Sequence, residues 1–261
     1  MSLEILDKPR FRIGKTFISV TTPQNTRRRI ADAVRKGHGG YICVSDPRTV
    51  DYASAHDDYG EVMNHSLMNL PDGQPIMWAA WLWGVEGVER TMGPVLFQEM
   101  IEDQTSGLKH FLLGDTEETL QQIVKKASAA GETIVGTLSP PFCSLDDFDY
   151  PGMAAVINQS QADIVWIAMR APKQDFFATR ILPYLDHKIC IGVGAAFRFY
   201  LGEYKLAPPL IRKLGLMGLY WGRKNQGYLA FIRGYLKDNM PFFWYLFKII
   251  IWRIIGRKYD E

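Results

Sequence analysis

The sequence lacks several signatures that would assign it a function directly. No strand-like run is followed by G-x-G-x-x-G, and G-x-x-x-x-G-K-S/T does not occur, so the dinucleotide fingerprint and the P-loop are both absent. Internal repeats, heptads and low-complexity stretches are also missing, which argues against solenoids and coiled coils. The N-terminal residues have no continuous apolar core followed by a small-residue cleavage site, so we expect no secretory signal.

Cysteine is scarce as well. Cys43, Cys143 and Cys190 are far apart in the sequence, form no metal-type pair and each lie in an apolar neighbourhood. Such cysteines are typical of buried thiols, which favours a reducing, cytosolic compartment. Across 261 residues, 47% hydrophobic and 22% charged side chains are ordinary for a globular protein. The length fits one large domain or a domain with an appendage.

Short apolar runs alternate with amphipathic stretches over the first 200 residues. Apolar strands separated by helices are typical of a mostly parallel sheet that is covered on both faces. We therefore expect an α/β fold with Rossmann-like layering in residues 1–200 and a basic appendage in residues 201–261. Strands are predicted at 17–20, 40–44, 67–70, 110–114, 133–136, 163–167 and 189–193, and helices at 22–35, after 46–47 and at 117–130.

One acid, Asp72, lies in a turn between Pro71 and Gly73 and directly before a tryptophan-rich apolar segment. Proline and glycine fix a backbone bend, so the carboxylate is held in place. A fixed carboxylate beside an apolar wall is suited to act as a general base. An ordinary turn acid would have the same local sequence, so both interpretations stay open at this level.

Several polar or glycine residues follow predicted strands directly. Ligands bind at the carboxyl ends of the strands in such a sheet. We therefore expect Asp46, Asp72, Gly114, Thr137 and Gly194 to gather at one edge, which favours Asp72 as a site residue. The GVGAA stretch around Gly194 is a weak signal for phosphate approach, and a tight turn below a buried helix explains it equally well.

The charge is distributed unevenly along the chain. Residues 201–261 carry 11 Lys and Arg against 4 Asp and Glu, whereas residues 1–200 carry 19 against 24. A basic end joined to an acidic body indicates an anionic partner for that end. Membrane lipid, a diphosphate or a nucleic acid would each fit on charge alone.

The tail at 241–259 reads PFFWYLFKIIIWRIIGRKY. It is too short and too charged to span a bilayer, yet more aromatic than a solvent-facing helix. Lys248, Arg253, Arg257 and Lys258 can snorkel from a partly immersed segment, so we favour an interfacial membrane anchor with a basic end. The alternative is a C-terminal helix packed on the core or on another subunit. Nucleic acid is not expected, because the aromatics are bunched with Ile and Leu.

Four ordered stretches make the chain resemble the WecG/TagA/CpsF glycosyltransferases, family twenty-six in the usual grouping. They are 70–73 (LPDG) with 89–93 (ERTMG), 111–114 (FLLG), 171–175 (APKQD) and 191–197 (IGVGAAF). The similarity runs from about residue 10 to the C-terminus. No single piece is specific, but their order and spacing together support the fold.

The resemblance implies an inverting, metal-independent transfer of a sugar, typically an N-acetylated hexosamine, from a UDP-sugar. The acceptor would be a sugar on a polyprenyl diphosphate at the inner face of the bacterial cell membrane, in the synthesis of a cell-surface polysaccharide or a teichoic-acid-like polymer. The family's proposed base falls on Asp72, and Gln174 would contact the nucleotide-sugar. The basic appendage would neutralise the leaving diphosphate and the tail would hold the enzyme at the membrane. No cofactor is implied, and a homo-oligomer stays open.

Beyond the catalytic Asp72, the substrate-binding residues form a larger set from both the core and the appendage. Some of them take their role from the resemblance and others from their place after a strand or their charge. They are Asp46, Gly73, Arg90, Gly114, Lys173, Gln174, Gly194, Arg198, Arg212, Arg223 and Arg233.

The chain also departs from the family pattern at polar positions. Val44 stands where the family usually has Thr, Val95 where it has Asp, Arg198 where it has Asp and Trp221 where it has Arg. Arg198 could match a carboxylate-bearing sugar such as a uronic acid. The losses motivate a second hypothesis, a catalytically weakened nucleotide-sugar-binding protein in a membrane polysaccharide assembly complex. A third, a Rossmann-like oxidoreductase, conflicts with the missing glycine fingerprint.

Overall fold

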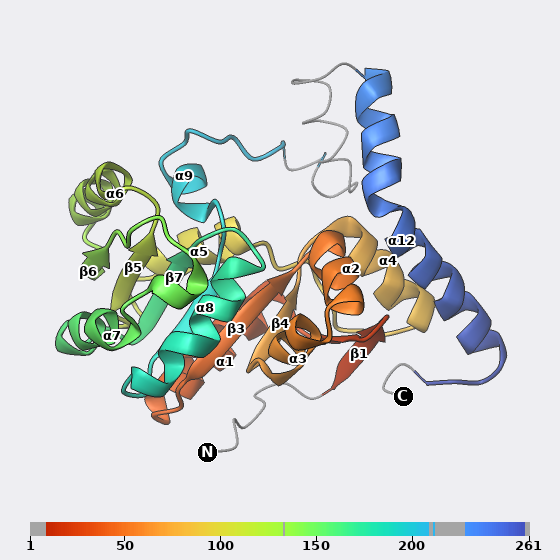
Figure 1. Ribbon diagram of the computed structural model, residues 1–261, viewed down its shortest axis with the longest axis horizontal. Coiled ribbons are helices and arrows are strands. Elements are labelled where there is room, and N and C mark those ends of the chain that lie inside the picture. The colour runs from red at the N-terminus through yellow and green to blue at the C-terminus, as the bar shows by residue number, and fades with distance from the viewer. Residues whose placement is uncertain (1–8, 133, 209–210, 212–227, 259–261) are drawn as a thin grey trace.

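A six-stranded parallel sheet forms the centre of the molecule (Figure 1). The computed structural model describes residues 9–132, 134–208, 211 and 228–258. The strand order is β4-β3-β8-β7-β5-β6, and every pair of neighbours is parallel, which confirms the predicted α/β class. The strands are β3 (Gly40–Ser45), β4 (Met68–Pro71), β5 (His110–Gly114), β6 (Ile134–Leu138), β7 (Ile164–Ala168) and β8 (Ile189–Gly192).

Helices cover both faces of this sheet, as its continuous apolar strands require. One face packs on α1 (Pro23–Arg35), α5 (Gly93–Ile101), α6 (Glu117–Ala130) and α9 (Ala196–Tyr200). The other packs on α7 (Tyr150–Gln159) and α8 (Lys173–Ile181), with the short turns η1 (Leu145–Asp147) and η2 (Leu182–Tyr184) beside them. Alternate residues of each strand face the two layers, so Ile42 joins the first core and Cys43 the second.

The ends of several helices follow from capping residues in the sequence. The Thr22 and Thr116 hydroxyls accept hydrogen bonds from the first turns of α1 and α6, and the Asp46 carboxylate does so for α2 (Pro47–Ala55). Gly131 ends α6 in a left-handed conformation. The predicted helices at 22–35 and 117–130 are therefore confirmed almost to the residue.

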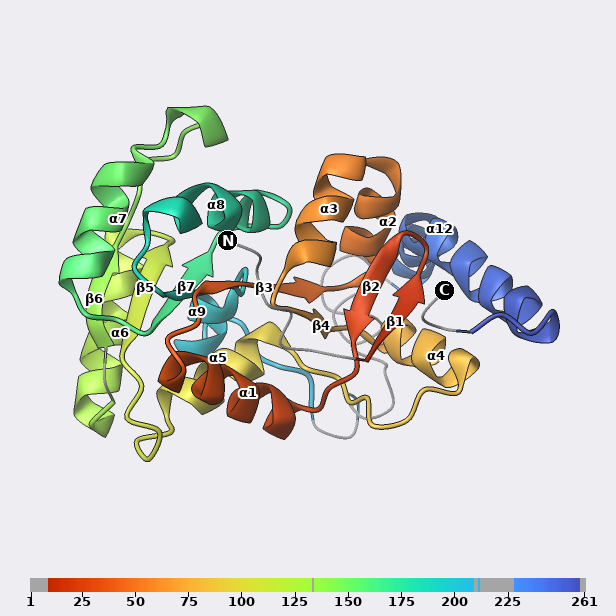
Figure 2. The same cartoon turned by 90° about the horizontal axis from the view of Figure 1, so that it is seen from below.

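The predicted strand at 17–20 exists but does not belong to the parallel sheet. It is β2 (Thr16–Ser19), which pairs antiparallel with β1 (Arg10–Ile13) in a separate two-stranded hairpin. A turn through Gly14, at a φ of 61°, folds the chain straight back onto β1. Figure 2 shows this hairpin beside α4 (Gln74–Trp83) and α12 (Tyr228–Ile254).

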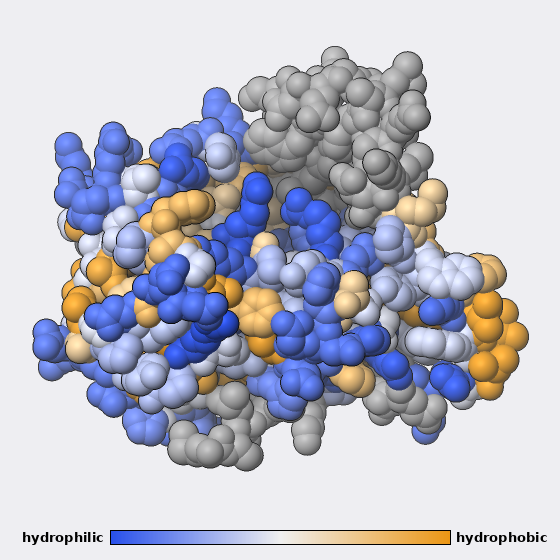
Figure 3. Space-filling view, viewed as in Figure 1, coloured by the Kyte–Doolittle hydropathy of each residue, from blue (hydrophilic) through white to orange (hydrophobic). Residues whose placement is uncertain are grey.

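The C-terminal helix α12 packs on the body through its second half. Phe242 and Ile249 are buried in a cluster with residues of the hairpin and α4. The opposite side exposes a stripe of large apolar residues, and Figure 3 shows hydrophobic side chains gathered at this edge of the molecule. The stripe is Met240, Trp244, Phe247, Ile250, Ile251, Ile254 and Ile255. Within the described ranges, no helix combines the length and apolar character needed to cross a bilayer.

The tail thus combines features of both predicted alternatives, because one side is packed and the other is exposed and apolar. Helix α3 (Asp57–His65) packs beside α2 and α8. The division into a core of residues 1–200 and an appendage stays a prediction.

Candidate active site

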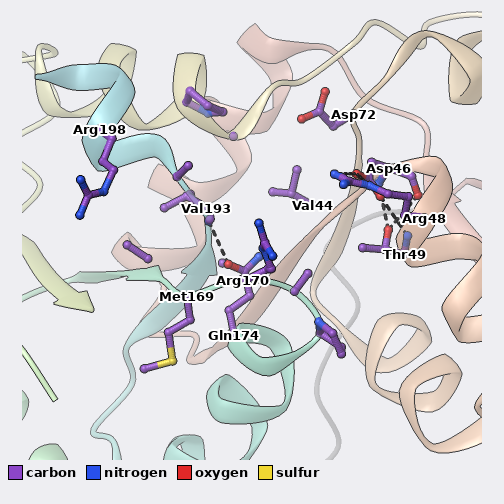
Figure 4. A pocket seen from close by; sticks show the side chains of 18 of the residues that line it. Val44, Asp46, Arg48, Thr49, Asp72, Met169, Arg170, Gln174, Val193 and Arg198 are labelled. Atoms are coloured by element: carbon purple, nitrogen blue, oxygen red, sulfur yellow. Dashed lines mark hydrogen bonds and ion pairs between the residues drawn. The ribbon is translucent and has the colours of Figure 1, made fainter. Parts of the chain in front are cut away.

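A pocket of about 660 Å³ opens at the carboxyl ends of the parallel strands. Its walls come from the segments that follow β3, β4, β5, β7 and β8, together with the first turn of α5. Figure 4 shows Asp46 and Arg48 on one side and Arg198 on the other, with Arg170 and Gln174 between them. The position agrees with the rule that ligands of open α/β sheets bind at this edge.

Asp72 lies in this pocket one residue after β4. Its backbone N–H donates to the Ser45 carbonyl at 2.8 Å, which fixes the turn to the neighbouring strand β3. Gly73 follows at a φ of 97°, a conformation that suits glycine, and its place just before α4 lets the chain turn sharply after the acid. Asp72 is therefore held by strand, turn and helix at once.

Arg90 is the partner of Asp72. Its Nε and one Nη donate to Asp72 Oδ1 at 3.1 and 3.0 Å, and both side chains are mostly withdrawn from water. Loss of solvent raises the pKa of Asp72, and the attraction of Arg90 offsets this only in part. The second oxygen, Oδ2, takes no part in the Arg90 contact, so the carboxylate can accept a further proton donor.

Asp46 also lines the pocket, but its carboxylate is used within the fold. Oδ1 accepts from the Thr49 backbone N–H at 2.9 Å, and Oδ2 accepts from Arg48 at 2.9 Å. The Thr49 hydroxyl in turn interacts with the Asp46 backbone, which completes a capping box for α2. Asp46 thus fixes this wall and holds Arg48 at its rim.

Gln174 is buried and supports the loop after β8. Its Oε1 accepts a hydrogen bond from the Gly194 backbone N–H at 2.9 Å. A Cβ at Gly192 would meet the Gln174 side chain at 2.8 Å, so glycine is needed for this close approach. Gln174 and Gly194, both expected at the site, are therefore brought together at the pocket wall.

Arg198 reaches the pocket from α9 and is fully engaged by two acids. Nε and one Nη donate to the Asp115 carboxylate at 3.0 and 2.7 Å, and the other Nη donates to Glu203 at 3.0 Å. Asp115 itself has a φ of 59°, which is uncommon for a residue other than glycine. This pair weighs against Arg198 as a receptor for a uronic-acid carboxylate, because the ligand would have to displace Asp115 or Glu203.

The other expected residues differ in position. Gly114, at a φ of 106°, ends β5 where a Cβ would meet the Ala168 carbonyl oxygen at 2.7 Å, so it shapes the edge without lining the pocket. Lys173 points away, because its Nζ donates to the Cys143 carbonyl and lies near the Phe148 ring. Arg212 and Arg223 lie outside the described residues, as does the side chain of Arg233 in α12.

Sequence reasoning missed Arg170, which lines the pocket two residues after β7. Its side chain is exposed, and within the described part of the chain no ion pair or hydrogen bond engages the guanidinium. The strand-end rule that selected Asp46 and Asp72 would also have found it. The same rule would have found Asp115, which directly follows Gly114, and Arg48, which lies two residues after Asp46.

A buried acid, Asp175, lies beneath the pocket. The hydroxyl of Tyr59, which lines the pocket, donates to its Oδ2 at 2.7 Å, and the buried Cys43 thiol lies against the carboxyl group. Its Oδ1 has no hydrogen-bond partner in the described structure. Burial raises the pKa of Asp175 to about 7, because the ionised carboxylate is cut off from water and this disfavours the charged form.

The described residues contain no group of three or more His, Cys, Asp or Glu side chains arranged to hold a metal ion. The pocket acids Asp46, Asp72 and Asp115 each have an arginine partner instead. Participation of a metal or cofactor is not tested by this arrangement, and its expected absence stays a prediction.

Comparisons with known proteins point in one direction. The model of the glycosyl transferase WecG/TagA/CpsF family matches residues 11–255. Two similar relatives, from Staphylococcus aureus strains MRSA252 and NCTC 8325 / PS 47, are named N-acetylglucosaminyldiphosphoundecaprenol N-acetyl-beta-D-mannosaminyltransferase. Each is 24% identical over 181 residues, which cover 69% of this chain and 70% of the relative.

The raised pKa of Asp175 predicts a pH-dependent stability. The unfolded carboxyl titrates near pH 4 and the folded one at about 7, so the free energy of unfolding should fall as pH rises through this window. The full loss is on the order of 4 kcal/mol. Asp175→Asn should remove the part of this slope that comes from Asp175 and leave the part from Asp51, whose pKa burial also raises to about 7. Urea unfolding at several pH values measures the slope. Asp146→Asn, at an exposed acid, should keep it; an unchanged slope in Asp175→Asn would contradict the assignment.

Proposed function

The chain belongs to the WecG/TagA/CpsF family of glycosyl transferases, and on this basis we propose that it transfers a sugar from a UDP-sugar to a sugar on a polyprenyl diphosphate. The reaction inverts the anomeric centre and needs no metal. It takes place at the inner face of the bacterial cell membrane and serves the synthesis of a cell-surface polysaccharide or a teichoic-acid-like polymer. The name of the Staphylococcus aureus relatives, which specifies an N-acetylglucosaminyl diphosphoundecaprenol acceptor, supports this acceptor class.

The observation that carries the proposal is the position of Asp72. It is a carboxylate fixed at the strand edge, paired through one oxygen with Arg90, and open to the pocket. An acceptor hydroxyl must lose its proton as it attacks the anomeric carbon, and a placed carboxylate typically contributes about 10²–10⁴-fold to such a step. The raised pKa of Asp72 makes it a stronger base than a surface aspartate.

Departure of UDP leaves negative charge on the diphosphate, which a site without metal must stabilise with cations or backbone N–H groups. Arg170 is the pocket arginine whose guanidinium no described residue engages, and Arg48 lies at the rim. The atoms nearest to a Cβ built at Gly194 lie 3.9 Å away or more, which leaves room for phosphate oxygens beside this residue. These groups suit the diphosphate between the nucleoside and the reacting sugar.

The donor is of the N-acetylhexosamine type in this proposal. A uronic acid would need a cation for its carboxylate, and the charge of Arg198 is already neutralised by Asp115 and Glu203. Gln174 acts on the donor through the Gly194 loop that it supports. The name of the relatives, an N-acetyl-beta-D-mannosaminyltransferase, is consistent with this sugar class.

A second candidate function is nucleotide-sugar binding without turnover. The observation that favours it is the apolar Val44 at the strand end in the pocket, together with an Asp46 whose carboxylate is committed to capping α2. Binding of a UDP-sugar without transfer to a lipid-linked acceptor would support this alternative.

Two substitutions separate catalysis from binding. Asp72→Asn should lower transfer from the preferred member of a UDP-sugar panel by about 10²–10⁴-fold while UDP binding stays within a few-fold. Arg170→Ala should weaken UDP binding by about tenfold or more, since a charge-assisted contact is lost. Calorimetry gives the binding constant, and release of UDP with product analysis gives the rate. Arg180→Ala, at an exposed arginine outside the pocket, is the control. Equal transfer by Asp72→Asn would remove Asp72 as the base.

The pH profile tests the pairing with Arg90. Transfer requires ionised Asp72, so kcat/KM should fall as pH drops through its pKa. Arg90→Gln removes the attraction that lowers this pKa, and the acidic limb should move to higher pH. Arg180→Gln should leave the limb in place. A limb that stays fixed in Arg90→Gln would show that another group controls it.

The exposed stripe of α12 is the proposed membrane contact of the tail. Its large apolar residues lie next to Lys248, Arg253 and Arg257, a combination suited to an anionic membrane surface. Removing residues 241–261 would also remove buried Phe242 and Ile249, so point substitutions on the outer side are the cleaner probe.

Phe247→Glu should reduce sedimentation with phosphatidylglycerol-containing vesicles by about tenfold, because a half-exposed aromatic is replaced by an anion. The control is Phe142→Glu, which changes a fully exposed aromatic outside α12 and should bind as wild type does. Equal sedimentation of both variants would favour a tail that only packs on the body.

A further inference from the structure

Helix α4 has an unusual outer surface. None of its residues from Gln74 to Trp83 is charged, and its inner side is buried through Ile76, Ala79 and Trp83. The outward residues are also large and aromatic, with Trp81 75% exposed and Trp78 39% exposed. A helix that faces only water normally carries polar residues on its outer side. The outer side of α4 therefore indicates a contact with something other than bulk water.

Helix α4 is joined to α12, which carries the exposed stripe. Trp83 and Trp252 stack with their ring centroids 6.1 Å apart, and Arg253 donates from one Nη to the Leu82 carbonyl at 2.7 Å. Figures 1 and 2 both show α4 and α12 lying against each other. Trp81 and the tail thus lie on two helices that pack together, and a surface that binds one is close to the other.

The same helix begins directly at the catalytic turn. Asp72 and Gly73 precede the first residue of α4, and Trp81 lies eight residues beyond Gly73. At 1.5 Å per residue, Gly73 and Trp81 lie about 12 Å apart along the axis of α4. A contact at Trp81 therefore keeps Asp72 within about one helix length of whatever Trp81 touches.

We propose that Trp81, supported by Trp78, is a second membrane contact, which inserts into the headgroup layer beside α12 and keeps Asp72 within about one helix length of the lipid. This inference rests on the proposed lipid-linked acceptor. The chemistry fits a bilayer surface, because tryptophan prefers the membrane interface and the neighbouring Lys248, Arg253 and Arg257 favour anionic lipids. The acceptor sugar, linked to the lipid through its diphosphate, is then held in the neighbourhood of the base.

The first experiment measures binding. Wild type, Trp81→Glu, Phe247→Glu and the control Phe142→Glu are sedimented with vesicles of phosphatidylcholine and phosphatidylglycerol. Trp81→Glu should lower partitioning by about tenfold, comparable to Phe247→Glu, while Phe142→Glu partitions as wild type does. With brominated lipids, the quenching of tryptophan fluorescence should fall in Trp81→Phe, a substitution that keeps the side chain apolar and aromatic.

The second experiment measures transfer. On a lipid-linked acceptor in vesicles, Trp81→Glu should raise the apparent KM several-fold, whereas on a short-chain, water-soluble acceptor its kcat should equal that of wild type. The two acceptors separate the α4 contact from the proposed function. If wild type transferred sugar to neither acceptor, the proposed function itself would be contradicted.

Partitioning of Trp81→Glu equal to wild type, alongside a loss in Phe247→Glu, would overturn the α4 contact and leave the tail contact standing. A wild-type dimer in solution that Trp81→Glu converts to a monomer, seen by sedimentation velocity without vesicles, would also overturn it. In that case the outer side of α4 binds a second copy of the chain. Quenching that does not change in Trp81→Phe would likewise contradict insertion.

Discussion

The structure depends on a single constraint, the parallel direction of all six strands in the central sheet. Because every strand runs the same way, the loops after β3, β4, β5, β7 and β8 meet at one edge, although they are spread over some 150 positions of the sequence. Gly114 and Asp115 both take positive φ values at this edge, and a Cβ at Gly114 would collide with the neighbouring strand. The site is therefore built by the sheet, and glycine is needed where two strands end close together.

Pairing of charge dominates the electrostatics of the pocket. Three acids line it, and each is matched by an arginine, so the acids do not repel an anionic ligand as strongly as their number implies. Arg170 is then left in excess, within the described residues, as positive charge that faces the pocket. A nucleoside diphosphate fits this balance better than a cationic ligand does. Asp72 and Asp46 each contact their arginine through one oxygen, whereas both oxygens of Asp115 contact Arg198. The second oxygen of Asp46 caps α2.

Much of the fold was predictable because its signals are local. Caps such as Thr22 and Asp46 mark helix starts in the sequence, and apolar runs mark the strands. The hairpin was misassigned, because an isolated apolar run does not reveal whether its partner is parallel or antiparallel. In the site, the strand-end rule placed Asp46, Asp72 and Gly194 correctly at the pocket. It could not show that Arg198 pairs with Asp115, which lies 83 positions away, since such a pair exists only after folding.

The tail explains why one sequence pattern supported two alternatives. The tail is apolar on both sides of its helix, so its sequence alone does not show which side packs on the body and which side stays exposed. In α12, Phe242 and Ile249 bury one side in the hairpin–α4 cluster, and the stripe around Phe247 is left exposed. Packing fixes the direction of the exposed stripe relative to α4, and α4 starts at the turn that carries Asp72. The burial of one side of the tail therefore fixes the position of its exposed side relative to the turn that carries Asp72.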